Sequence, residues 1–129
     1  LKSFGTNFGM TFQLIDDAID YSSNKKILGK NTGDDFKEGK ITLPIILAYG
    51  RSNEKEKKFW ERTISKLNQN EGDFEIALGI INKYQCIEDT ITRANHFSNV
   101  AIDSLDIFRN NIYKEKLVSL VKTSVSRIY

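Results

Sequence analysis

The chain has 129 residues, of which 40% are hydrophobic and 28% charged, and its formal net charge is +2. This length is enough for one domain with a core of its own, and the composition is that of a soluble globular protein. Acidic and basic residues are interspersed, which excludes the basic patch of a nucleic-acid-binding protein, and no apolar run approaches the ~20 residues that span a bilayer. The single cysteine, Cys86, excludes an internal disulfide and fits a reducing compartment, so we expect a cytoplasmic protein.

The first predicted helix, residues 2–22, carries polar side chains on one face and apolar side chains around the rest. The polar positions have the i, i+3, i+4 and i+7 spacing of a single helix face and are Gln13, Asp16, Asp17 and Asp20. A helix that is apolar nearly all round is a buried helix, so we expect the acids to line a cavity. The alternative is a solvated acidic face, which the lack of neighbouring Lys or Arg disfavours. Carboxylate oxygens suit Mg²⁺, which completes its shell with water and substrate phosphates.

The loop that follows, residues 23–40, supplies the opposite charge. Lys30 and Lys40 flank the acidic pair Asp34–Asp35, and a short helical turn is expected at residues 34–38. A Lys ammonium is a compact point charge that can meet a phosphate. Without the acidic helix beside them, solvated loop charges would be the better interpretation of these lysines. Together, the helix and the loop have what a metal–diphosphate site needs.

The rest of the chain predicts further helices separated by turns, at residues 43–49, 53–69, 73 to about 84, 87–108 and 114–128. Thr42 and Asp73 are placed to cap two of these helices. Pro44, the only proline, fits the first turn of a helix and argues against a strand. His96 has no catalytic partner nearby in sequence, so a surface or hydrogen-bonded role is expected. The fold class is therefore all-α, with about six helices and no sheet.

Apolar residues at helical spacing predict the core of these helices. Cys86 is expected to be a small buried hydrophobic residue, and Gly5 and Gly9, four residues apart, to permit a close helix crossing. The expected core positions include Ile41, Ile45, Ile46, Trp60, Ile64, Leu67, Ile76, Ala77, Ile80, Ile81, Ala94, Ala101, Leu105, Phe108, Leu117, Leu120 and Val121.

The stretch FQLIDDAIDY followed by LGKNTGDDFKEGKITLPIILA resembles the second aspartate-rich region of the trans-prenyl diphosphate synthases, which are all-helical enzymes that elongate isoprenoid chains. The form LGKNTGDDFKEGKITLP is most similar to that of the long-chain, octaprenyl-type members, which make quinone side chains. The match is dense over residues 9–47 and continues in helix order to the end of the chain. The resemblance implies the isoprenoid-synthase helical bundle, with residues 1–129 as a single all-helical domain. We expect this domain to be its C-terminal half, the N-terminal half with the first aspartate-rich motif being absent.

The resemblance also implies a Mg²⁺-dependent prenyltransferase. Its substrates would be an allylic prenyl diphosphate and isopentenyl diphosphate, joined head-to-tail into a longer trans-polyprenyl diphosphate. Mg²⁺ would neutralise the diphosphate and make it a better leaving group. By position in the motif, Asp16 would be a direct metal ligand, and Asp17 and Asp20 ligands or water-mediated partners.

The remaining site residues follow from the same resemblance. Lys30 and Lys40 would contact the allylic diphosphate and stabilise the departing charge. Gln13 would form a hydrogen bond near the metal or the substrate, and Asp35 would act through water or by holding a lysine. Phe12 would lie near the isoprenoid tail, with core packing as an equal alternative.

Some parts of such a site are missing from the chain. No second acidic triplet occurs downstream, and no basic residues for isopentenyl diphosphate are evident, so the chain alone is expected to be inactive. Arg127 is interpreted as a surface residue, with contact to the second diphosphate as the alternative. A homodimer is expected from the resemblance.

Two other functions remain open: a non-catalytic subunit of a heteromeric synthase, and a terpene cyclase on the same fold, which the lysine loop disfavours.

Overall fold

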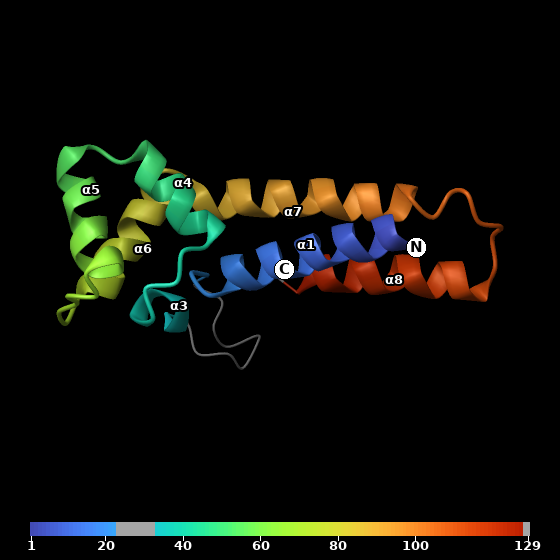
Figure 1. The fold of residues 1–129 in the computed structure, drawn as a ribbon, viewed down its shortest axis with the longest axis horizontal. Coiled ribbons are helices and arrows are strands. Elements are labelled where there is room, and N and C mark those ends of the chain that lie inside the picture. The colour runs from blue at the N-terminus through green and yellow to red at the C-terminus, as the bar shows by residue number, and fades with distance from the viewer. Residues whose placement is uncertain (23–32, 128–129) are drawn as a thin grey trace. The chain divides into compact units, whose positions relative to one another are not determined.

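The computed structural model describes residues 1–22 and 33–127, and these residues form helices joined by turns (Figure 1). The helices are α1 (Lys2–Ile19), α3 (Asp34–Lys37), α4 (Leu43–Arg51), α5 (Glu54–Trp60), α6 (Asp73–Lys83), α7 (Cys86–Asp103) and α8 (Ile112–Ser126), with a π-helical turn η1 (Glu61–Ser65). These two described ranges contain no strand. The all-α prediction is confirmed.

The chain divides into two compact units, each with a core of its own. The first unit combines Leu1–Asp16 with Ile91–Tyr129, and the second is Asp17–Thr90. The boundaries fall inside α1 and α7, so each of these helices contributes to both units. The predicted acidic face is divided in the same way, between Asp16 and Asp17.

In the first unit, α1, α7 and α8 lie lengthwise, and α7 runs antiparallel to the other two (Figure 1). Their shared core is Phe4, Ala101, Leu105 and Val121, with Phe8, Ile102, Leu117 and Val118 packed against it. The buried hydroxyl of Thr11 on α1 donates to the Asn7 carbonyl at 2.9 Å and to the Ala94 carbonyl of α7 at 3.4 Å. The apolar stripes of three separate segments therefore meet, as their helical spacing requires.

In the second unit, α3 to α6 surround an apolar core. This core contains Tyr21, Phe36, Ile45, Ala48, Trp60, Ile64, Ala77, Ile80, Ile81 and Cys86. Cys86 is buried and free, as predicted. The N-terminus of α5 has a capping box, in which Asn53 and Glu56 bond each other's backbone N–H groups. Glu56 also accepts hydrogen bonds from the Tyr84 hydroxyl at 2.6 Å and from Lys83 Nζ at 3.0 Å, which ties α5 to the end of α6.

Both predicted side-chain caps are wrong. Thr42 occupies the N-cap position of α4, but its hydroxyl makes no hydrogen bond to any of the described residues. The N-cap of α6 is Gly72, and Asp73 is the first helical residue. The Asp73 carboxylate instead accepts from the Asn70 N–H at 2.7 Å and from Arg62 at 2.8 and 3.1 Å. Tertiary contact with an arginine on η1 has replaced the local cap.

Several predicted core residues are exposed. Leu67 is 55% exposed, because the helical segment ends at Ser65 and Leu67, beyond it, has a positive φ of 53°. Phe108 is exposed because α7 ends earlier than predicted, at Asp103. Ile41 is exposed because it precedes α4 and is not part of a helix. Ile46, Ile76 and Leu120 lie on helix faces that are exposed in the described part of the chain.

The predicted close crossing at Gly5 and Gly9 is also wrong for the described part of the chain. A Cβ atom added at either glycine would meet nothing within 4 Å. Both residues lie on the exposed side of α1. Their small size therefore has no packing role among the described elements.

Candidate functional site

The carboxylates of α1 turn inward where the helix ends. Asp17 is 5% exposed and Asp20, the residue directly after the helix, is 0% exposed, whereas Asp16 is intermediate. The burial predicted from the sequence is therefore confirmed for Asp17 and Asp20. A buried carboxylate is unfavourable unless hydrogen bonds or cations compensate its lost hydration. The surroundings of this pair should therefore include donors.

The chain supplies such donors from the start of α3, fifteen residues further on. The backbone N–H of Asp35 donates to Asp20 Oδ2 at 3.0 Å, and the N–H of Gly33 donates to the Asp20 carbonyl at 3.1 Å. Asp20 thus holds the start of α3 through both its side chain and its backbone. This arrangement brings the start of α3, which carries Asp35, to the end of α1.

Lys40 is tied to the same place. Its Nζ lies 3.9 Å from Asp35 Oδ1, and its backbone N–H donates to the Asp35 carbonyl at 2.9 Å. Of the two roles considered for Asp35, holding a lysine is the one with a contact in the structure. The Lys40 side chain is 48% exposed, so the pair is weak in water and its ammonium group is accessible to a ligand. Lys30, the other predicted lysine, lies outside the described residues.

Gly39 determines how the chain reaches Lys40. Its φ is +67°, in the left-handed region that favours glycine, and a Cβ there would lie 2.9 Å from the Ile64 carbonyl oxygen of η1. Glycine therefore permits both the turn after α3 and its close approach to η1. The position of Lys40 depends on that turn.

Tyr21 lies in the core of the second unit, directly after Asp20, and no role was predicted for it from the sequence. The side chain is 2% exposed, and its hydroxyl makes no hydrogen bond within residues 1–22 and 33–127. Burial raises the pKa of Tyr21 well above its usual range, and the charges of Asp20, Asp35 and Asp17 raise it further, in that order. The only sequence signal was its place directly after the third acid of IDDAIDY.

Phe12, Gln13 and Arg127 lie in the first unit, and sequence reasoning did not foresee the contact between Phe12 and Arg127. Phe12 is 46% exposed, so core packing among the described residues is wrong for it, and Gln13 is exposed. The Arg127 guanidinium carbon lies 4.2 Å from the centre of the Phe12 ring. The same side chain donates to the Phe12 carbonyl at 3.3 Å and to the Ser124 carbonyl at 3.2 Å. This cation–π contact joins the end of α8 to α1.

The donor chemistry of the cluster fits a hard cation, but it does not form an all-protein cage. The described ranges contain no group of three or more His, Cys, Asp and Glu side chains arranged to hold a metal ion. Mg²⁺ is commonly held by one or two carboxylates, with water and substrate phosphates completing the shell. Asp17 and Asp20 offer oxygen ligands of this kind.

In the described part of the chain, no helix has the length and apolarity needed to cross a membrane.

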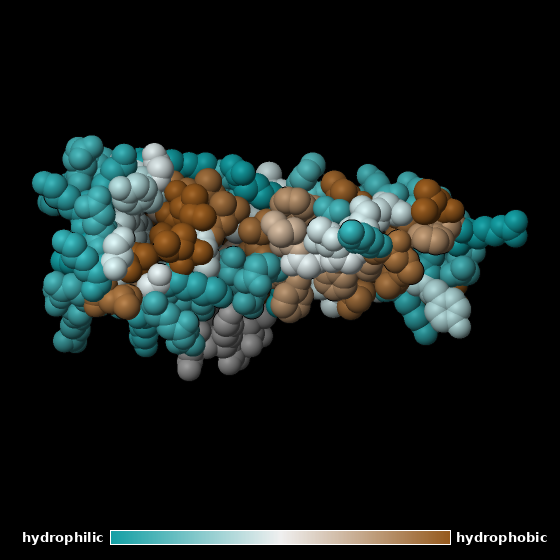
Figure 2. Space-filling model, in the orientation of Figure 1, coloured by the Kyte–Doolittle hydropathy of each residue, from teal (hydrophilic) through white to brown (hydrophobic). Residues whose placement is uncertain are grey.

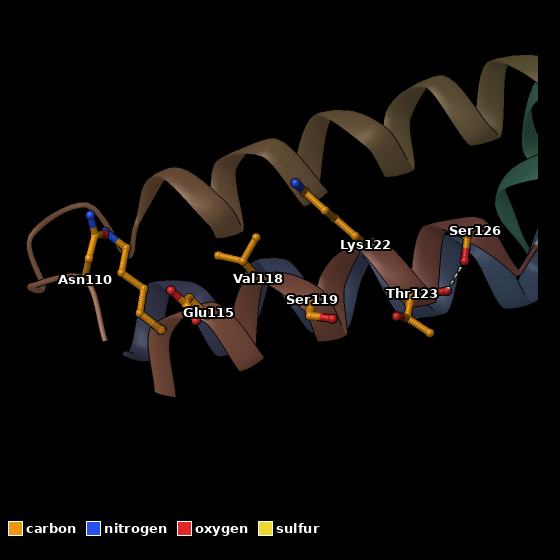
Figure 3. A pocket seen from close by; sticks show the side chains of 8 residues that line it. Asn110, Glu115, Val118, Ser119, Lys122, Thr123 and Ser126 are labelled. Carbon is orange, nitrogen blue, oxygen red and sulfur yellow. Dashed lines mark hydrogen bonds between the residues drawn. The ribbon is translucent and has the colours of Figure 1, made fainter. Parts of the chain in front are cut away.

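Several surface hollows lie on other elements, and two of them are shown in the figures. Figure 2 shows apolar side chains gathered over α4, where a groove of about 260 Å³ is lined by Ile41, Ile45, Ile46, Tyr49, Trp60, Glu61, Ile64 and Ser65. A groove of about 580 Å³ follows α8 (Figure 3) and is lined by Asn110, Lys114, Glu115, Val118, Ser119, Lys122, Thr123 and Ser126. None of these lining residues is a predicted site residue. The acid cluster with Lys40 remains the candidate site.

Comparisons with known proteins identify the family of the chain. The family model of the polyprenyl synthetases matches residues 1–81. The octaprenyl diphosphate synthase of Haemophilus influenzae is 36% identical over 129 residues, which is 100% of this chain and 39% of that protein. The all-trans-nonaprenyl-diphosphate synthase of Rhodobacter capsulatus is 33% identical over 128 residues, again 39% of that protein. The chain thus spans about two-fifths of the length of these relatives and matches their C-terminal part.

Solved structures give the same answer. A decaprenyl diphosphate synthase from Rhodobacter capsulatus superposes with a TM-score of 0.91 at 35% identity, covering 98% of this chain and 39% of that one. A polyprenyl synthase from Caulobacter crescentus CB15, crystallised with calcium and isoprenyl diphosphate, gives a TM-score of 0.89 at 42% identity over the same shares of the two chains. The family model, the relatives and the solved structures all indicate the same family. The chain therefore belongs to the polyprenyl synthetase family and has the isoprenoid-synthase helical fold.

Proposed function

We propose that this chain carries the second aspartate-rich motif of a Mg²⁺-dependent trans-polyprenyl diphosphate synthase. Such an enzyme condenses an allylic diphosphate with isopentenyl diphosphate, and the product class would be the long chains of quinones. The observation that carries the proposal is the contact series from Asp20 through Asp35 to Lys40, at 3.0 and 3.9 Å. It joins buried carboxylates to an accessible ammonium group, which are the two kinds of group that a metal-bound diphosphate requires.

In this proposal, the acidic residues bind the metal ion and the lysines bind the diphosphate. Asp16 is a direct metal ligand, and Asp17 and Asp20 are ligands or act through bound water. Mg²⁺, when bound, neutralises the diphosphate and acts as a Lewis acid on its oxygens. Gln13 forms a hydrogen bond near the metal or the substrate.

Lys30 and Lys40 contact the allylic diphosphate. As its C–O bond breaks, negative charge accumulates on the departing diphosphate, and the two ammonium groups stabilise that charge in place. The double bond of isopentenyl diphosphate then attacks the allylic carbocation, and loss of a proton leaves a trans double bond in the longer chain. Asp35 holds Lys40 in reach, and Phe12 lies near the isoprenoid tail.

We further propose a cytoplasmic homodimer whose catalysis needs more than these 129 residues. The homodimer rests on the family resemblance alone, and the buried free cysteine fits a reducing compartment. The need for further residues rests on the share of the relatives that the chain covers, about two-fifths. The chain alone should therefore show no elongation. A first acidic motif and the groups that bind isopentenyl diphosphate would come from elsewhere in the complete polypeptide.

The test is product analysis with the complete polypeptide that contains these residues. Incubation with farnesyl diphosphate, labelled isopentenyl diphosphate and Mg²⁺ should give linear trans-polyprenyl diphosphates, and the isolated chain should give none. Cyclic hydrocarbons would indicate a terpene cyclase instead. No incorporation, together with stimulation of another subunit, would indicate a non-catalytic partner. Elongation by the isolated chain would contradict the prediction of inactivity.

A further inference from the structure

Tyr21 presents a hydroxyl group that the packing of the core does not need. The side chain is 2% exposed, and its oxygen is buried without a hydrogen bond to the described residues. An unpaired buried hydroxyl is unfavourable, and phenylalanine would fill the same space without that cost. A polar atom retained at a loss of stability calls for a functional explanation.

The ring of Tyr21 is held firmly in place. It belongs to the core of the second unit, and its centre lies 6.3 Å from that of the Phe74 ring. Tyr21 directly follows Asp20, and its ring shares the core of the second unit with Phe36, the residue after Asp35. The Asp35 N–H in turn donates to Asp20 Oδ2 at 3.0 Å. The buried oxygen is therefore held in the core where the end of α1 meets the start of α3, the two segments that carry these acids. Toward a carboxylate, a neutral hydroxyl can act only as a donor.

We propose that Tyr21 is a positioning residue for the acid cluster, and that its hydroxyl donates a hydrogen bond to the carboxylates of Asp17, Asp20 or Asp35 when they hold a metal-bound diphosphate. This inference rests on the proposed function. Carboxylates that ligate a metal are themselves held by hydrogen bonds, which orient the oxygen that faces the ion. The Asp35 N–H holds Asp20 Oδ2 at 3.0 Å. The tyrosine supplies a second donor to the same group of acids.

The substitution Tyr21→Phe separates this role from simple packing, because it removes the oxygen and keeps the ring. Without ligand, the melting temperature of the variant should equal or exceed that of the wild type. With Mg²⁺ and inorganic pyrophosphate, the rise in melting temperature should be smaller than in the wild type. The Mg²⁺ concentration for half-maximal elongation should increase roughly 10-fold, the lower end of the loss seen for outer partners of metal ligands.

Tyr84→Phe is the matched control. The Tyr84 hydroxyl donates to Glu56 at 2.6 Å, on elements that carry no proposed site residue, and it therefore has a structural bond to lose. This variant should melt at a lower temperature without ligand, while its Mg²⁺ dependence stays that of the wild type. The two phenylalanine variants are thus expected to show opposite patterns.

All measurements use the complete polypeptide, by differential scanning fluorimetry and by elongation at varied Mg²⁺. If Tyr21→Phe responds to Mg²⁺ and pyrophosphate as the wild type does, the oxygen has no role in the cluster and the inference is overturned. A lower melting temperature of Tyr21→Phe without ligand would overturn it as well, since the hydroxyl would then be structural. A wild type that neither elongates nor responds to Mg²⁺ and pyrophosphate would refute the proposed function itself, and the inference with it.

Discussion

Replacing Gly39 by alanine tests whether the turn before Lys40 is required. Its φ of +67° costs an L-residue roughly 1–2 kcal/mol, because the Cβ approaches a neighbouring carbonyl. The new Cβ would also lie 2.9 Å from the Ile64 carbonyl oxygen, which belongs to a helical backbone and cannot move freely. Relieving such a contact costs about 1 kcal/mol or more, and the lower entropy of unfolded alanine returns about 0.4–1 kcal/mol. The net expectation is a loss of about 1–3 kcal/mol in the free energy of unfolding.

The same substitution should lower activity beyond its effect on stability. Relief of the contact shifts the turn and moves Lys40 relative to Asp35, whose carbonyl accepts the Lys40 N–H at 2.9 Å. A displacement of this kind at a charge-stabilising group can cost on the order of 10²-fold in rate. Elongation should be assayed well below the melting temperature of the variant, so that the loss of activity cannot reflect unfolding.

Gly79 provides the control for this experiment. It lies within α6, its φ is not positive, and an added Cβ would meet nothing within 4 Å. Alanine there should stabilise the protein by up to about 1 kcal/mol, the difference in helix propensity, and leave elongation unchanged. Chemical denaturation of both variants measures the two free energies. If Gly39→Ala unfolds at the same denaturant concentration as the wild type and elongates at its rate, the argument about the turn is wrong.

Three further predictions concern two site residues and the loss of folding stability at acid pH. Asp16→Ala in the complete polypeptide should reduce elongation roughly 10²-fold or more, as when a preorganised charge-stabilising group is lost, and wild-type turnover would remove Asp16 from the site. Lys40→Ala should lower elongation while the free energy of unfolding changes by less than about 1 kcal/mol, because its ion pair is exposed; a large loss of stability would contradict this. Hydrogen bonds, first of all from the Tyr84 hydroxyl, lower the pKa of Glu56 from 4.5 to about 2, so its contribution to stability is present above about pH 4.5 and is lost as the pH falls toward 2. Glu56→Gln should therefore flatten the fall of melting temperature between these pH values, and an unchanged slope would refute the assignment.

The local elements of the chain could be predicted from the sequence. Helical periodicity gave α1 and α8 to within a few residues, and Pro44 correctly marked the start of a helix rather than a strand. The burial of Asp17 and Asp20 was also predictable, because their neighbours on the helix are apolar. These features depend on residues within two turns of one another.

Contacts between distant segments decided the rest. The helical segment ended at Ser65 and left Leu67 exposed beyond it. The Asp73 carboxylate pairs with Arg62 and does not serve as the cap that its position indicated. The stack of Arg127 on Phe12 joins residues 115 positions apart. Periodicity within one helix carries no information about such partners, because they depend on how the helices pack.

For this protein, the amino-acid sequence by itself determined the all-helical class, the acidic face of α1 and the family resemblance. Only the tertiary structure decided that Asp20 holds the start of α3 and that Asp35 in turn holds Lys40. It also decided that the Tyr21 hydroxyl is buried without a hydrogen bond to the described residues. The physical reason is range: side-chain spacing along a helix is a local property, whereas hydrogen bonds to a buried carboxylate depend on which distant backbone the fold brings to it.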